Sequence, residues 1–270
     1  MKWIALIAVT LTGSLLLFGV GDFPEWGDPH SPANQGPKLE SGEQVSKAVS
    51  QDFLTETYEV TKVPNVVTAV LADYRGYDTM FETVVVFAAG LAIFAILRVF
   101  GDGSDTPPMR AVEDDTFVEG DHSRIIIGTT CKLLIPIIQL FALYVIAHGH
   151  YSPGGGFQGG VIMGASFILL AIARDLKSAL DWFSEKNFMT LASVGILIYA
   201  GLGVLCQFFE RNFLDYGALK VFMISSDHPE QMARSYSMLG VEIGVAFTVT
   251  AIMFAIYANL SSRGELKEGL

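Results

Sequence analysis

Long apolar runs with almost no charge are the feature that most restricts the folds open to this chain. A helix needs about 20 mostly apolar residues to cross the hydrocarbon core of a bilayer. About six runs meet this need, and they predict an all-α integral membrane protein with about six transmembrane helices. The predicted spans are Trp3–Val20, Phe81–Phe100, Ile125–Ala147, Phe157–Ala173, Met189–Phe209 and Met238–Leu260.

The composition excludes several other classes of protein. Of the 270 residues, 51% are hydrophobic and 17% are charged, whereas soluble domains carry about a quarter charged residues. Disorder and a soluble enzyme are therefore disfavoured. The net charge of −11 argues against a nucleic-acid partner. Cys131 and Cys206 lie in apolar runs and offer no disulfide framework or metal-ligand spacing, so we expect no metal and no cofactor.

The first run has an alternative interpretation as a signal peptide, because Lys2 precedes it. The run is longer than the usual 7–15-residue core of such a peptide, and no A-x-A cleavage pattern follows. We favour an uncleaved helix. A slight excess of Lys and Arg on the side of the termini then predicts that both termini are cytoplasmic.

Breaks between the runs predict the domain organisation. We expect a two-helix membrane region over residues 1–100, an acidic linker over 101–123, a four-helix membrane domain over 124–262 and a tail over 263–270. A short apolar stretch after Pro64 is too short to span a bilayer, so it predicts a re-entrant or interfacial helix before the second span. Gly76 is the expected left-handed cap of that short helix.

Acidic residues gather around the start of the second predicted span. Asp78 and Glu82 are four residues apart and share a helix face, with Asp73 close by in sequence. An acidic group inside an apolar run is a candidate for binding or relaying a cation or proton. Two alternatives remain: Thr79 and Glu82 match a capping box, and Arg75 neutralises one carboxylate.

Lys132 interrupts the third predicted span roughly 10 Å beyond its start. A lysine at that depth is a candidate proton-relay or gating residue. The alternative is a side chain that extends to the membrane surface or pairs within the protein. Pro136 removes the amide that would bond the Lys132 carbonyl, so we expect a kink there.

Glu242 lies in the last predicted span between Gly240 and Gly244. The two glycines allow close helix contact, and Glu242 is rotated from them by about 200°. We therefore expect Glu242 to face another neighbour or a cavity, as part of an ion path or as a structural interhelix bond. It enters the membrane from the side opposite to Lys132, so a direct pair of the two is not assured.

A glycine-rich segment joins the third and fourth predicted spans. It lacks the pattern of a nucleotide-binding loop. Gly156, Gly160 and Gly164 recur every four residues and predict a smooth stripe for close helix packing. The preceding Pro153, Gly154 and Gly155 cannot form a stable helix, so this backbone must be covered by protein or line an aqueous cavity. His148 and His150 are expected to be surface or hydrogen-bonded residues.

These motifs resemble a known family. The run Pro153-Gly154-Gly155-Gly156-Phe157-Gln158-Gly159-Gly160, with Lys132 upstream and Val241-Glu242-Ile243-Gly244-Val245 downstream, resembles the MrpB/MnhB-type component of Mrp-type multisubunit cation/proton antiporters over about residues 120–262. The run from Asn65 to Thr79, with Glu82, resembles the E-type component of membrane-bound hydrogenases, which corresponds to the C-terminal part of the large MrpA component, over about residues 1–100. The chain is thus similar to a fusion of two neighbouring subunits.

The resemblance implies an accessory subunit, without a catalytic site of its own, that lines or supports the ion path of a sodium (or other monovalent cation)/proton antiporter. It implies a prokaryotic cell (inner) membrane, and as partners the lipid bilayer, large antiporter-like subunits and small multi-helix subunits. One alternative is the same module in a redox-driven complex such as a membrane-bound hydrogenase. Another is a purely structural assembly subunit.

Overall fold

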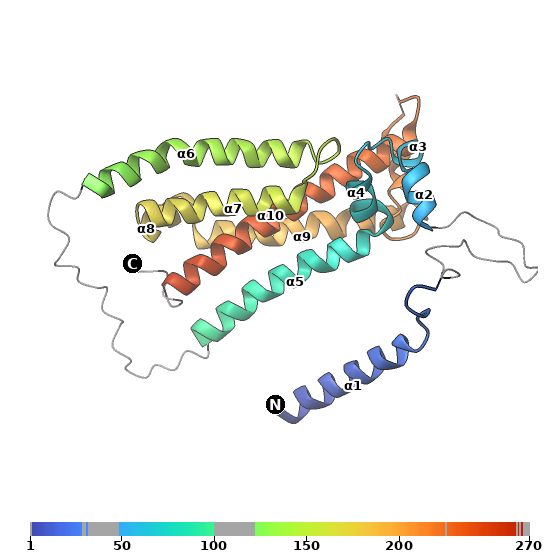
Figure 1. Ribbon diagram of the computed structural model, residues 1–270, viewed down its shortest axis with the longest axis horizontal. Coiled ribbons are helices and arrows are strands. Elements are labelled where there is room, and N and C mark those ends of the chain that lie inside the picture. Colours follow the sequence, from blue (N-terminus) through green and yellow to red (C-terminus); the bar gives the residue numbers. More distant parts are fainter. Residues whose placement is uncertain are drawn as a thin grey trace, which may run out of the picture. The chain divides into compact units, whose positions relative to one another are not determined.

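The computed structural model describes residues 2–28, 31, 49–99, 122–224, 226–262, 264 and 266. Every regular element in this described part is helical (Figure 1), which confirms the predicted all-α class. The chain divides into two compact units, Met1–Glu56 and Thr57–Leu270. The predicted acidic linker, up to residue 121, and most of the predicted tail lie outside the described residues.

The first unit contains α1 (Lys2–Val20) and the short α2 (Val49–Thr55). Helix α1 coincides with the first predicted span. Its apolar part, Leu6–Val20, is shorter than the other candidate spans. A sixth span therefore stays a prediction.

Five helices of the second unit are long and apolar enough to cross a membrane. They are α5 (Gly76–Phe94, continued by the π-helix η2, Ala95–Val99), α6 (His122–Ala147), α7 (Gly156–Ala173), α9 (Glu185–Phe208) and α10 (Pro229–Ser261). Each coincides with one predicted span. Pro136 lies inside α6.

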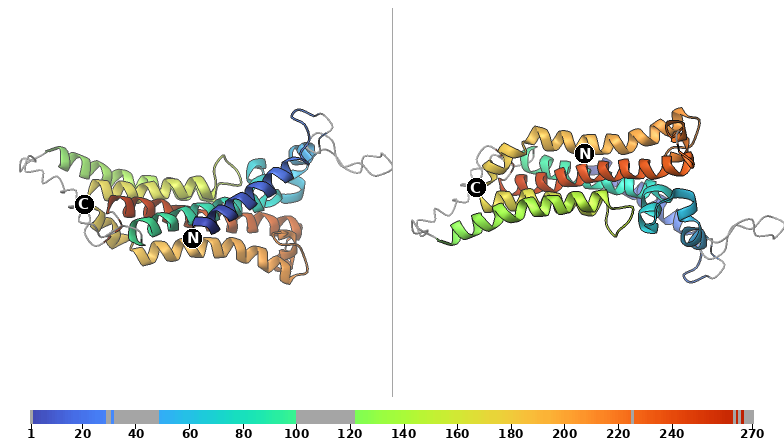
Figure 2. Two further views of the ribbon diagram at one scale, coloured as in Figure 1. Left: turned by 90° about the horizontal axis from the view of Figure 1, so that it is seen from below. Right: turned by 90° about the horizontal axis from the view of Figure 1, so that it is seen from above.

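Helix α10 is the central helix of this bundle. It packs against α9, α7 and α5, and Figures 1 and 2 show it running between its neighbours. The most apolar stretch of α10 is 67% buried, whereas the corresponding stretches of the other four helices are 11–33% buried. The core therefore follows α10, with Val249, Ile252 and Phe254 fully buried. Because α5 packs on α9 and α10, the front segment after Thr57 belongs to the same bundle as the rest.

Short helices connect the long ones. These are α3 (Thr57–Thr61), α4 (Val66–Ala69), the π-helix η1 (Val70–Tyr74), α8 (Leu176–Trp182) and the 3-10 helix η3 (Tyr216–Phe222). The α4–η1 pair forms the short helix predicted before the second span.

Two predicted helix ends were wrong. Gly76 is the first residue of α5 and is not among the positive-φ residues, because the chain enters α5 directly from Arg75. Thr79 lies inside α5 and does not cap it, since α5 begins one turn earlier than the apolar run. The Thr79 hydroxyl instead donates to the Leu71 carbonyl at 2.8 Å.

Candidate functional site

Glu242 is a buried acidic residue enclosed by glycines. It is 8% exposed and faces the loop between α6 and α7. A Cβ atom on Gly155 would lie 2.7 Å from Glu242 Oε1, and one on Gly149 would strike the same carboxylate. Within the described residues, Glu242 Oε2 has no hydrogen-bond partner. The structure thus brings together the acid and the glycine segment that the sequence singled out separately.

The glycines allow the backbones of α7 and α10 to approach closely. A Cβ on Gly156 would overlap the Glu242 carbonyl, and those on Gly160 and Gly164 would lie 3.0 and 3.2 Å from the carbonyl oxygens of Ala246 and Thr250. The Thr250 hydroxyl donates to the Gly160 carbonyl at 3.1 Å. The stripe Gly156, Gly160 and Gly164 therefore lies on α10.

Gly154 shapes the turn that delivers the chain to this contact. It has φ +127, a conformation that L side chains rarely adopt. A Cβ there would also lie 2.8 Å from Val145 Cγ1. Pro153, immediately before it, is exposed. Substitution at Gly154 would therefore alter the path of the loop.

Asn65, the N-cap of α4, holds the loop from the other side. Its Nδ2 group donates to the carbonyls of Gly149 and Ser152 at 2.8 and 2.9 Å, and its backbone amide donates to the His150 carbonyl at 2.9 Å. The Thr68 hydroxyl donates to the Gly149 carbonyl at 2.7 Å. The loop that encloses Glu242 is therefore fixed by residues more than 80 positions away in the sequence.

His150 contributes a second polar atom without a partner. Its Nε2 is buried and makes no hydrogen bond within the described residues. Burial lowers the pKa of His150 below its ordinary value, which favours the neutral ring. His148 instead stacks on Tyr144, with ring centroids 4.0 Å apart.

Asp73 belongs to a separate ion-pair network. Both of its carboxylate oxygens accept from Arg234 Nη1, at 2.9 and 3.0 Å, and Arg234 Nη2 donates to Asp215 at 3.1 Å. Burial raises the pKa of Asp73, while the Arg234 charge acts in the opposite direction. This pair connects η1 to α10. Neither Arg234 nor Asp215 was singled out from the sequence.

Asp78 and Glu82 do not join Asp73 in a common site. Asp78 forms an ion pair with Arg75, and both side chains are exposed. This is the neutralisation that the sequence left open. Glu82 is exposed on α5. The three acidic residues near the second span therefore have three different surroundings.

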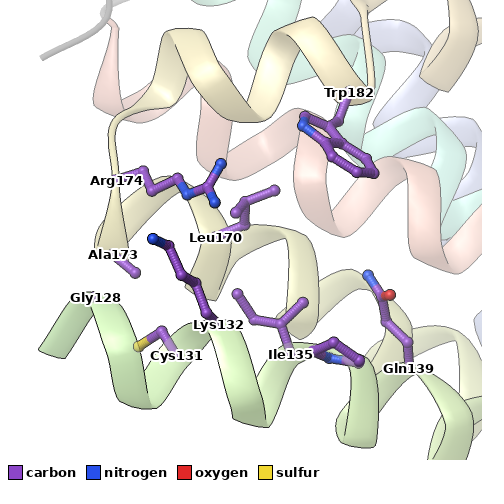
Figure 3. Close-up of a pocket in the computed structure, with 10 residues that line it drawn as sticks. Gly128, Cys131, Lys132, Ile135, Gln139, Leu170, Ala173, Arg174 and Trp182 are labelled. Atoms are coloured by element: carbon purple, nitrogen blue, oxygen red, sulfur yellow. The ribbon is translucent and has the colours of Figure 1, made fainter.

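Lys132 lies inside α6, in the half of the helix that is far from the loop. Its side chain is exposed and lines a pocket together with Arg174, Gln139 and Trp182 (Figure 3). Roughly 22 Å along the helix axis separates it from Ala147 beside the loop. The structure therefore does not bring Lys132 to Glu242, and its role as a relay stays a prediction. The described residues include no group of three or more potential metal ligands.

Two family models match this chain in tandem. Residues 41–111 match the MbhE model, which describes the E-type component of MBH, and residues 126–255 match one described as "Domain related to MnhB subunit of Na+/H+ antiporter". A Staphylococcus aureus (strain Newman) protein named as antiporter subunit mnhB2 is 30% identical over 138 residues, which is 51% of this chain and 94% of that protein. The chain belongs to the MnhB family.

Other relatives extend over both segments. The uncharacterized protein MJ1307 of Methanocaldococcus jannaschii is 31% identical over 66% of this chain and 70% of its own length. A K(+)/H(+) antiporter A/B subunit of Rhizobium meliloti is 28% identical over 63% of this chain, but the match spans only 18% of that protein.

Solved structures show the same fold. A chain of the Mrp complex from Dietzia sp. has a TM-score of 0.58 and 23% identity, over 94% of this chain and 25% of its own length. A chain of the membrane-bound sulfane sulfur reductase, an archaeal respiratory membrane complex, has a TM-score of 0.50 and 22% identity, over 93% of this chain and 97% of its own. With its family and its apolar helices, the chain is a multi-pass membrane protein.

The two matched segments share the Glu242 site. The MnhB segment supplies the glycine loop and Glu242, whereas the segment matched by the MbhE model supplies Asn65 and Thr68. The hydrogen bonds from Asn65 and Thr68 therefore cross from one segment to the other.

Proposed function

We propose that the chain is an accessory membrane subunit of an Mrp-type antiporter that exchanges sodium or another monovalent cation for protons, and that Glu242 lies on its ion path. The antiporter-subunit relatives support the first part. The observation that carries the second part is the buried Glu242 carboxylate with an oxygen that lacks a partner among the described residues.

The surroundings of Glu242 favour the alternate binding of a proton and a monovalent cation by its carboxylate. An unpaired carboxylate in a low-dielectric interior is costly, and a proton or a monovalent cation relieves that cost. The glycines leave no side chain over the carboxylate in the loop. Backbone carbonyls in a non-helical segment are suitable ligands for a cation that has lost part of its water. A single carboxylate can thus bind a proton or a cation in turn.

The chain works in a larger assembly under this proposal. Large antiporter-like subunits and small multi-helix subunits are its partners, in a prokaryotic cell (inner) membrane with both termini on the cytoplasmic side. Exposed apolar side chains on α6, among them Leu133, Leu140 and Phe141, provide surface for lipid and for such partners.

The test is cation-dependent proton flux in inverted membrane vesicles that contain the complete complex. Glu242→Gln keeps the shape of the side chain and removes its charge, so we expect flux to fall by about tenfold or more. Glu242→Asp keeps the charge and should retain part of the flux. Glu210→Gln, at an exposed position, is the matched control. Normal flux in Glu242→Gln at normal subunit levels would favour the purely structural role.

A redox-driven complex is the second candidate, and the match to the MbhE model favours it. Purification of the native assembly distinguishes the two functions. An antiporter contains Mrp-type subunits and no stoichiometric iron. A respiratory complex contains iron–sulfur subunits, and their presence would replace the antiporter proposal while leaving the role of Glu242 open to the flux test.

A further inference from the structure

A pocket between α6, α7 and α8 carries two positive charges. It has a volume of about 190 Å³ and is lined by Cys131, Lys132, Gln139, Arg174 and Trp182 among others. Figure 3 shows the side chains of Lys132 and Arg174 side by side in this pocket, with the Lys132 amine pointing toward the Arg174 side chain. We propose that Lys132 and Arg174 bind the phosphate of an anionic phospholipid.

The two positive charges in the pocket have no ion-pair partner among the described residues, although the nearby Asp175 carboxylate interacts electrostatically with Arg174. Neither Lys132 nor Arg174 forms an ion pair with any residue that the structure describes. Asp175 follows Arg174, but its carboxylate accepts from the Ser178 amide and hydroxyl at 2.5 and 3.1 Å. Two cations that share one space repel each other, and a bound anion removes that repulsion.

The position of the pocket points to a lipid. Arg174 directly follows the last residue of the α7 span, and the long Lys132 side chain reaches the same level from inside α6. Trp182, 75% exposed, is the residue type that gathers at the membrane–water boundary. Basic pockets between transmembrane helices at this level bind anionic headgroups.

The residues beside the pocket suit the rest of the lipid. The pocket lining also includes the apolar side chains of Ile135, Pro136 and Leu170, so acyl chains have an apolar surface next to the charged group. The planar Arg174 guanidinium can donate two parallel hydrogen bonds to phosphate oxygens, while the Lys132 amine acts as a compact charge. A free phosphate would use only the two cations and none of this apolar surface.

The experiment is native mass spectrometry of the purified complex with added phosphatidylglycerol, phosphatidylcholine or inorganic phosphate. The wild type should retain phosphatidylglycerol in preference to phosphatidylcholine. Each basic residue contributes about fivefold to the affinity for an anionic lipid, so the double variant Lys132→Ala/Arg174→Ala should lose about twenty-five-fold. Lys177→Ala, an exposed lysine in α8 outside the pocket lining, should keep the wild-type preference.

Three results would overturn the proposal. One is an unchanged lipid preference in the double variant. Another is an equal loss in Lys177→Ala, which would indicate a diffuse charge effect. The third is retention of inorganic phosphate without phosphatidylglycerol. The single variant Lys132→Ala gives the same comparison if the double variant fails to assemble, with an expected loss of about fivefold. The lipid test does not depend on the transport function.

Discussion

Lys132 and Glu242 interrupt apolar helices in the same way in the sequence, yet their surroundings in the structure are opposite. The long lysine stem carries its charge into the pocket at the end of α7, where Arg174 also lies. The shorter Glu242 side chain has no such reach and stays buried under the loop. The position of each residue in the sequence therefore predicted the depth of its backbone, whereas the length of the side chain decided where its charged group lies.

Gly156 gives a sharp prediction at the same scale. In Gly156→Ala, the new methyl group overlaps the Glu242 carbonyl in α10, so the helices must separate at a cost of about 3 kcal/mol. The control Gly201→Ala places its methyl group where nothing lies within 4 Å and should be stabilising by about 0.5–1 kcal/mol.

Thermal unfolding of the purified complex measures both changes. A midpoint that falls for Gly156→Ala and stays level or rises for Gly201→Ala is expected. Equal midpoints would mean that α7 and α10 are not in backbone contact at Gly156.

At the scale of elements, α4 and its N-cap residue hold the loop between α6 and α7 in place through hydrogen bonds. Asn65 both caps α4, by accepting from the Val67 amide, and donates to the Gly149 and Ser152 carbonyls. Asn65→Asp keeps the acceptor for the cap and removes the donor to the loop. We expect amide exchange across residues 149–156 to accelerate by about tenfold or more, since each lost hydrogen bond costs about 1 kcal/mol or more.

Hydrogen exchange of the complex measures this effect, and α4 itself should stay protected. The exposed Asn187→Ala in α9 is the control and should leave the loop unchanged. Unaltered loop exchange in Asn65→Asp would show that the hydrogen bonds do not hold the loop closed.

The long helices could be predicted from the sequence, because a long apolar run is by itself enough to indicate a membrane-spanning helix. All five helices that meet the span criteria were expected, but α10 begins at Pro229, earlier than its apolar run. Its polar first turns become helical because they pack on η3 and η1. A contact of that kind joins segments far apart in the chain, so no local pattern announces it.

Only part of the candidate site could be predicted from the sequence, because the contacts that assemble it join segments far apart in the chain. Glu242 and the glycines each stood out by residue type, whereas their contact depends on the angle at which α7 meets α10. Asn65 had a visible local signal, an N-cap residue before an apolar stretch. Nothing local marked its bonds to Gly149 and Ser152, or the pairing of Asp73 with Arg234 across 161 positions.

At the scale of the whole molecule, the Asp73–Arg234 pair joins the two segments that match separate family models. The Asp73 side chain is 2% exposed, and removing one partner of a buried ion pair costs about 3–5 kcal/mol. If the chain is divided after Pro108 and both parts are expressed together, Arg234→Met should sharply reduce their co-purification. Asp73→Asn combined with Arg234→Met should restore part of it, because the buried Asp73 charge is then absent and Asp215 keeps its ion pair with Arg211.

Lys220→Met supplies the comparison for that experiment. It removes the exposed Lys220–Glu230 pair, and exposed pairs contribute at most about 1 kcal/mol. Co-purification should therefore be nearly normal. An equal loss in both variants would assign the effect to general damage at this end of the bundle.

The loop over Glu242 packs against α10 on one side and accepts hydrogen bonds from Asn65 and Thr68 on the other. Because one polypeptide carries all of these groups, they are made in equal copy number and reach the membrane together. Inheritance also keeps them together: a change in the length or path of the loop has to suit both flanking surfaces at once. Exchange of either segment for that of a distant relative should therefore succeed only when the other is exchanged with it.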